Sequence, residues 1–158
     1  MITASLLYTF QTSTKPSLAL GFDYLSGQNP GDENYKAFDN LFGTHHKFYG
    51  YMDYFLSPTA EIGDATPGTG GAGLMDLHAR LSIKPCKKGS VALAFHMFST
   101  TEDYQLINIV DTDTTPTTAT ALGNEIDLTV KRKYNDNLTF VGGASYFMPG
   151  DIFKDEKG

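Results

Sequence analysis

The chain of 158 residues contains no tryptophan, one cysteine and few charged residues, which make up 19% of the sequence. The single cysteine, Cys86, cannot form an intrachain disulfide. One cysteine and four histidines without regular ligand spacing predict no metal site. The net charge of −6 and the lack of long lysine or arginine runs argue against nucleic acid as a partner.

Long apolar runs are also missing. No segment approaches the roughly 18 apolar residues that a membrane-spanning helix needs, so membrane helices are excluded. Residues 1–10 lack the basic start and apolar centre of a signal peptide, and they alternate like a strand. We therefore expect the chain to begin inside a larger protein.

The motifs of common catalytic sites are absent as well. The sequence has no Gly-x-Ser-x-Gly elbow, no phosphate-binding loop and no His-Glu-x-x-His motif. Asp76 and His78 have no positioned serine or cysteine partner for nucleophilic catalysis. We expect no enzyme activity and no cofactor.

The sequence does have a two-residue alternation of apolar and polar side chains. In residues 74–83, apolar residues at odd positions alternate with Asp76, His78, Arg80 and Ser82. Successive side chains of a strand point to opposite faces, so this pattern predicts a strand with one apolar and one polar face. Six segments of about 9–11 residues follow it, the length of a tilted membrane-spanning strand: 2–11, 17–26, 74–83, 90–99, 124–132 and 138–148. A soluble sheet with its apolar face on a core is the alternative.

The connections between these segments alternate in length. Residues 12–16, 85–89 and 134–137 are short, whereas 27–73 and 100–123 are long. Outer-membrane barrels have short turns on one side of the membrane and long loops on the other. Residues 46–56 have the composition of a strand, but one more strand would break this order. We therefore interpret 27–73 as one large extracellular loop.

Polar positions of the predicted strands are the candidates for solute contact. In a barrel they would face the lumen and influence solute selectivity through their charge. Alternatively, they have a structural role and pair across neighbouring strands as side-chain ladders. They are Asp23, Asp76, His78, Arg80, Lys84, His96, Glu125, Asp127 and Lys131. In the large loop, candidates for a constriction are His46, Lys47, Tyr49, Tyr51 and Asp53. Aromatic residues near strand ends fit the interfacial girdles of a barrel, whereas in a soluble fold they would belong to the core: Tyr8, Phe10, Tyr24, Phe98, Tyr146 and Phe147.

Residues 35–55, from Tyr35 to Phe55, resemble the loop signature of the alginate-export family of bacterial outer-membrane proteins. Residues 21–27 resemble the strand before that loop, and 73–88 resemble the next strand with its Lys-Pro-x-Lys-Lys turn. Residues 123–128 and 143–147 resemble later strands. The resemblance implies an all-β fold, a closed antiparallel transmembrane β-barrel. Residues 1–158 would be its C-terminal part, with about six meander strands, fewer than the roughly 8 of the smallest barrel.

The resemblance further implies an outer-membrane porin or export-type channel in a Gram-negative bacterium. Its partners would be outer-membrane lipid, lipopolysaccharide and a hydrophilic solute such as a saccharide or polyuronate. The predicted lumenal residues carry mixed charge, which argues against alginate itself as the solute. A non-transporting surface barrel for adhesion and a soluble β-sheet binding protein are the alternatives, and the oligomeric state is not predicted.

Overall fold

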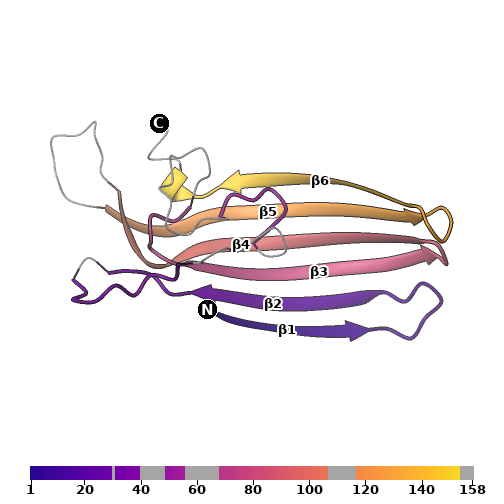
Figure 1. The fold of residues 1–158 in the computed structure, drawn as a ribbon, viewed down its shortest axis with the longest axis horizontal. Coiled ribbons are helices and arrows are strands. Elements are labelled where there is room, and N and C mark those ends of the chain that lie inside the picture. The colour runs from indigo at the N-terminus through magenta and orange to yellow at the C-terminus, as the bar shows by residue number, and fades with distance from the viewer. Residues whose placement is uncertain (30, 40–48, 56–67, 107–116, 154–158) are drawn as a thin grey trace.

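The computed structural model describes residues 1–29, 31–39, 49–55, 68–106 and 117–153. Six strands form one sheet in the order in which they follow along the chain, and each pairs antiparallel with the next (Figure 1). The strands are β1 (Ile2–Thr9), β2 (Ser17–Leu25), β3 (Leu74–Cys86), β4 (Gly89–Leu106), β5 (Thr117–Lys133) and β6 (Thr139–Pro149). The all-β meander predicted from the alternation is confirmed, and the open sheet is consistent with part of a larger barrel.

Among the described residues, no helix is long and apolar enough to cross a membrane.

The second long connection is shorter than the sequence predicted. Residues 100–123 were expected to form a loop, but β4 continues to Leu106 and β5 begins at Thr117. Beyond a register shift near Ser99, pairing resumes between Tyr104 and Ala119 and runs to the pair Leu106 and Thr117. Backbone hydrogen bonds hold this extension, and polar residues form them as well as apolar ones. The alternation of side chains therefore could not reveal it.

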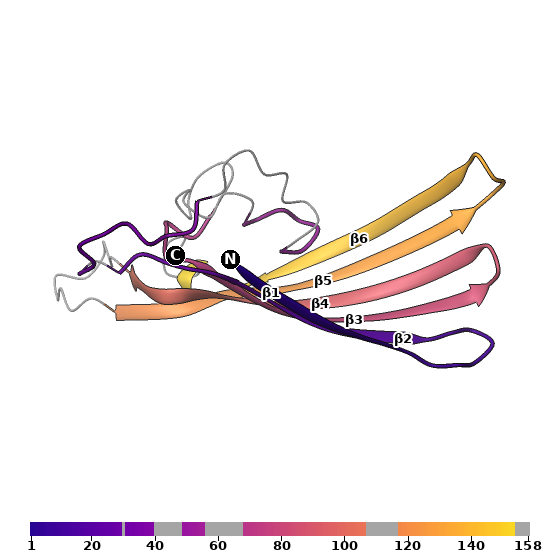
Figure 2. The ribbon, with the colours of Figure 1, turned by 60° about the horizontal axis from the view of Figure 1, so that its bottom comes forward.

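The three short turns lie at one end of the sheet, and the chain makes its long connections at the other (Figure 1). The described residues between β2 and β3, including 49–55, contain no strand. Figure 2 shows the sheet as curved, with the coloured 49–55 segment lying over one of its faces.

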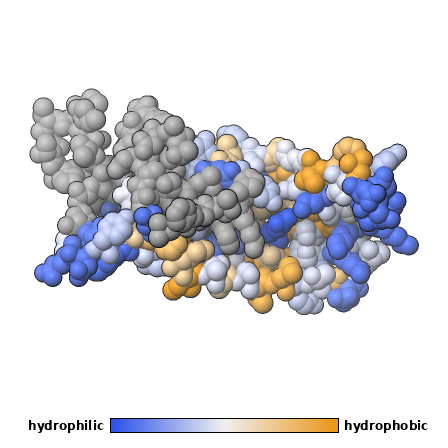
Figure 3. Space-filling model, in the orientation of Figure 1, coloured by the Kyte–Doolittle hydropathy of each residue, from blue (hydrophilic) through white to orange (hydrophobic). Residues whose placement is uncertain are grey.

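The face made by alternate apolar residues is exposed. The register brings Leu20, Ala79, Phe95 and Ile126 into one row across four strands. Leu81 and Leu93, which pair with each other, are 50% and 48% exposed. No described segment covers this face, so it has the character of a lipid-facing surface. Figure 3 shows hydrophobic residues along both lateral margins of the sheet and hydrophilic residues at the turn end.

The buried core lies on the opposite face, at the loop end of the sheet. There Phe98 and Phe147 pack with Phe55 from the loop and with Ile152 and Phe153 after β6; Leu25, Tyr49, Leu74 and Leu122 complete the cluster. Of the two roles that the sequence left open for Phe98 and Phe147, the structure places both residues in the core and not in an interfacial girdle. Phe98 is paired with Asp76 and Phe147 with Glu125, so both aromatic side chains share the face of these carboxylates and lie beneath the loop.

Candidate functional site

The polar face carries its charges in an ordered sequence along the strands. Asp23 pairs with Asp76 in the row nearest the loop end, and His78, His96 and Glu125 form the next row. Arg80, Ala94 and Asp127 form the third row. Lys84 and Lys131 follow near the turns, where they surround a hollow of about 200 Å³ with Lys87, Lys88 and Lys133. The polar face is therefore acidic toward the loop and basic toward the turns.

Two histidines and three aspartates form a close cluster in this acidic region. His96 Nδ1 lies 2.8 Å from Asp76 Oδ2, and His78 Nδ1 lies 3.4 Å from the same oxygen. Asp23 Oδ2 is 3.9 Å from His78 Nδ1, and Asp127 Oδ2 is 3.7 Å from His96 Nε2. The two imidazole rings are 5.2 Å apart, at an interplanar angle of 32°.

The backbone makes room for this cluster at Gly21. Gly21 is paired with His78, and a Cβ atom at position 21 would overlap the His78 ring. On its other side, the His96 ring stacks on Phe98 with 5.6 Å between ring centroids. A small residue under one ring and an aromatic residue beside the other hold both imidazoles in place.

The carboxylates of the site are buried, and histidines are the basic side chains that lie near them. Asp23, Asp76, Glu125 and Asp127 are each at most 3% exposed. No lysine or arginine among the described residues lies within ion-pair distance of them. Even with both histidines charged, the three aspartates alone leave an excess of negative charge. A buried charge without compensation costs several kcal/mol, so this region is suited to attract cations.

Glu125 attaches the loop to the polar face. Its Oε1 accepts hydrogen bonds from the backbone N–H groups of Tyr51, at 2.6 Å, and Met52, at 2.9 Å. Gly50 precedes them with φ of +82°, and a Cβ atom there would lie 2.5 Å from Glu125 Oε1. The loop therefore needs glycine at position 50, both for its left-handed backbone and for this close approach.

The side chain of Tyr49, a residue of the loop, lines the same cavity as the acidic cluster. Its side chain is 1% exposed, although its own backbone is left-handed with φ of 64°. Burial, followed by the nearby charges of Asp23 and Asp76, raises the pKa of the Tyr49 phenol to about 12. Tyr49, Gly50 and Tyr51 line a cavity of about 560 Å³ together with the cluster, and Arg80 and Ala94 line it as well.

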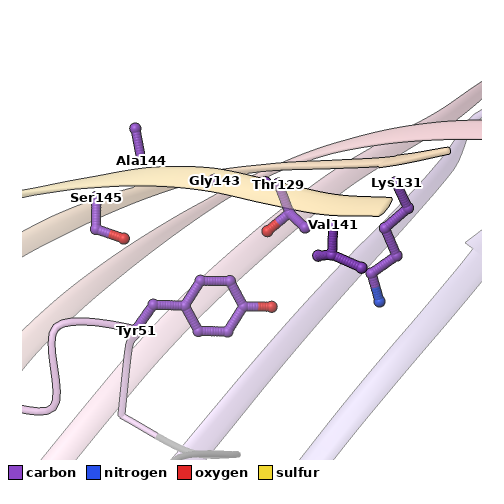
Figure 4. Close-up of a pocket in the computed structure, with 8 residues that line it drawn as sticks. Tyr51, Thr129, Lys131, Val141, Gly143, Ala144 and Ser145 are labelled. Carbon is purple, nitrogen blue, oxygen red and sulfur yellow. The ribbon is translucent and has the colours of Figure 1, made fainter. Parts of the chain in front are cut away.

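Tyr51 also lines a second hollow, of about 570 Å³, at β5 and β6. Figure 4 shows its ring on the same side of the sheet as Thr129, Lys131 and Ser145, whereas Ala144 points to the other side. An aromatic ring beside hydroxyl and ammonium groups is a surface suited to a hydrated polar solute.

The structure brings together most of the predicted site residues. Asp23, Asp76, His78, Arg80, His96 and Asp127 line the first cavity, whereas Glu125 binds the loop backbone and Lys84 and Lys131 lie nearer the turns. Among the loop candidates, Tyr49 and Tyr51 line the cavity, and Asp53 is half-buried with a left-handed backbone. His46 and Lys47 lie outside the described residues.

Sequence reasoning missed two parts of the site. The first is the attachment of the loop through Phe55 and the backbone of residues 51–52. The alternation of apolar and polar residues along the strands contains no information about these contacts. The second is the closeness of His96 to Asp76 and His78. Here a signal was present, since Asp76 and His78 are two residues apart on one strand and therefore share a face.

An exposed apolar face, a polar face of ionisable residues and a loop segment held against that polar face are consistent with part of a transmembrane β-barrel. The family model described as alginate export matches residues 2–158, and the chain belongs to this family. Membership places the chain among export-type outer-membrane channels in general, a transport family and not an enzyme family. No match was found among curated proteins, and none among solved structures.

Proposed function

We propose that the protein provides passive passage for a hydrophilic solute along the polar face of the barrel, across the bacterial outer membrane. The observation that carries this proposal is the position of the 49–55 segment, which lies against the polar face and not away from it. A loop held there narrows the path of a solute without closing it, and cavities of about 560 and 570 Å³ remain beside it.

The positions of basic and acidic residues along the polar face indicate which class of solute can pass. A polyanion would meet the lysines near the turns and then the four buried carboxylates near the loop. Electrostatic repulsion at the second region opposes a polyuronate, whereas an uncharged saccharide is not repelled there. We therefore place a neutral saccharide ahead of alginate as the solute.

Planar-bilayer recording and liposome swelling test this proposal on the full-length protein. We expect open-channel conductance and swelling in neutral oligosaccharides, with slower swelling in uronate oligomers of matched length. The substitution Asp127→Asn, which removes one buried charge, should accelerate uronate entry, whereas Asp136→Asn near the β5–β6 turn should not. A folded protein that never conducts would overturn the channel and favour a surface barrel for adhesion. Faster swelling in uronates than in neutral sugars would overturn only the solute assignment.

A further inference from the structure

We propose that Asp76, His78 and His96 form a binding site for a first-row divalent transition-metal ion such as Zn²⁺. One donor atom of each residue lies within 4.8 Å of the donor atoms of the other two. Asp76 Oδ2 is 2.8 Å from His96 Nδ1 and 3.4 Å from His78 Nδ1. Metal–ligand bonds of about 2.0–2.2 Å place neighbouring donor atoms about 3–3.5 Å apart. Small side-chain rotations are enough to close this set around an ion.

Unsatisfied carboxylate oxygens around the cluster point to a cation independently. Neither oxygen of Asp127 has a hydrogen-bond partner among the described residues, and the same holds for Asp23 Oδ1 and Asp76 Oδ1. All three residues are at least nine-tenths buried and line the same cavity as the two histidines. Buried carboxylate oxygens left without a hydrogen bond are unfavourable. A divalent ion supplies the missing positive charge.

The types of ligand indicate the class of metal. Imidazole nitrogen together with carboxylate oxygen suits zinc and its neighbours in the first transition row. Calcium and magnesium prefer sites made of oxygen ligands alone. Asp127 lies toward Nε2 of His96, on the ring edge opposite Nδ1. This is the place of the outer carboxylate that orients a metal-binding histidine, so Asp127 is a positioning residue and not a ligand.

The site is independent of the channel function, because its ligands lie on β3 and β4 and its positioning residue Asp127 lies on β5, and the same strands would form it in a non-conducting barrel. The proposed metal site and the side chain of Tyr49 line the same cavity. A bound ion there would reduce the excess negative charge of the polar face.

The test is titration of the metal-free, full-length protein in detergent with Zn²⁺ by calorimetry, and with Co²⁺ by visible absorption. We expect one strong ion per chain, and Ca²⁺ should not compete at equal concentration. Asp76→Asn, His78→Gln and His96→Gln should each remove strong binding, and Asp127→Asn should weaken it by about 10- to 100-fold. A double variant, His45→Gln with His46→Gln, serves as the matched control and should bind like the unaltered protein.

Circular dichroism and the shift of unheated protein in gel electrophoresis verify that each variant is folded, and only folded variants are compared. Equal Zn²⁺ affinity of the unaltered protein and folded Asp76→Asn would overturn the site. Loss of binding in the His45 and His46 double variant would overturn it as well, since the loop would then hold the ion. Equal affinity for Ca²⁺ and Zn²⁺ would overturn the transition-metal class.

Discussion

Removing the Phe55 side chain should release the loop from the polar face. Phe55 is fully buried, and its ring centroid lies 4.8 Å from that of Phe98, 6.1 Å from that of Phe147 and 6.5 Å from that of Phe153. Truncation of a buried phenylalanine to alanine costs about 3–5 kcal/mol. Since Phe55 belongs to the loop and not to a strand, the truncation should reduce the free energy of loop docking by this amount.

The docked population should therefore fall steeply in Phe55→Ala. Each 1.4 kcal/mol corresponds to a tenfold change in an equilibrium constant, so the ratio of docked to released loop should fall by about 100-fold or more. We expect larger single-channel conductance and faster proteolysis within residues 49–55, while the barrel stays resistant to cold detergent.

Phe95→Ala is the matched control for this experiment. Phe95 lies on β4 like Phe98 but on the opposite, apolar face, where it is partly exposed. The same truncation there should leave conductance and loop proteolysis unchanged. If Phe55→Ala conducts like the unaltered protein and its loop stays protected, the inference that the aromatic cluster holds the loop over the lumen is refuted.

Three further predictions concern the same region. Glu125→Ala removes the acceptor of two backbone hydrogen bonds and should weaken loop docking by about 1.5–3 kcal/mol, which is measured as faster proteolysis of the loop. Glu125→Gln keeps an acceptor oxygen and should retain most of the protection against proteolysis. The pKa of the Tyr49 phenol is about 12 with the loop docked, above the value of about 10 expected in a released loop. The protonated phenol therefore contributes fully to the free energy of loop docking below pH ~10, and this contribution is lost as the pH rises toward ~12. Conductance should therefore rise over that pH window in the unaltered protein but not in Tyr49→Phe; an identical rise in both would contradict the assignment. Gly21→Ala places a methyl group where the His78 ring lies and should lower the free energy of unfolding in urea by about 1–3 kcal/mol. Gly142→Ala is the control: the space at its Cβ position is open, so this variant should not lose comparable stability.

The sequence was sufficient to predict the six strands and their faces. In β3, the alternation of Asp76, His78 and Arg80 with apolar residues assigned every side chain to the face on which it lies, because a strand has a strict period of two. The same rule placed His96, Glu125 and Asp127 on the polar face. The antiparallel register follows from the short turns, which fix the alignment of the strands that they join.

The loop could not be predicted in the same way. Phe55 belongs to an irregular segment, so no periodicity shows which face it contacts. Phe98 and Phe147 resembled girdle residues because they are aromatic and near strand ends, yet their parity places them beneath the loop. The extension of β4 and β5 beyond residues 99 and 123 depends on backbone pairing across a register shift, which side-chain pattern does not record.

In the proposed channel, the polar face lines an aqueous path and the apolar face meets lipid. Cysteine accessibility at two adjacent residues of β4 distinguishes the two faces: Ala94, which lines the cavity, and Leu93, which is exposed on the apolar face. In a background with the exposed Cys86 changed to serine, Ala94→Cys and Leu93→Cys are treated with a charged, membrane-impermeant thiol reagent during bilayer recording. We predict that the reagent changes the current through Ala94→Cys and leaves Leu93→Cys unaffected. A response at Leu93→Cys with none at Ala94→Cys would contradict the assignment of the two faces.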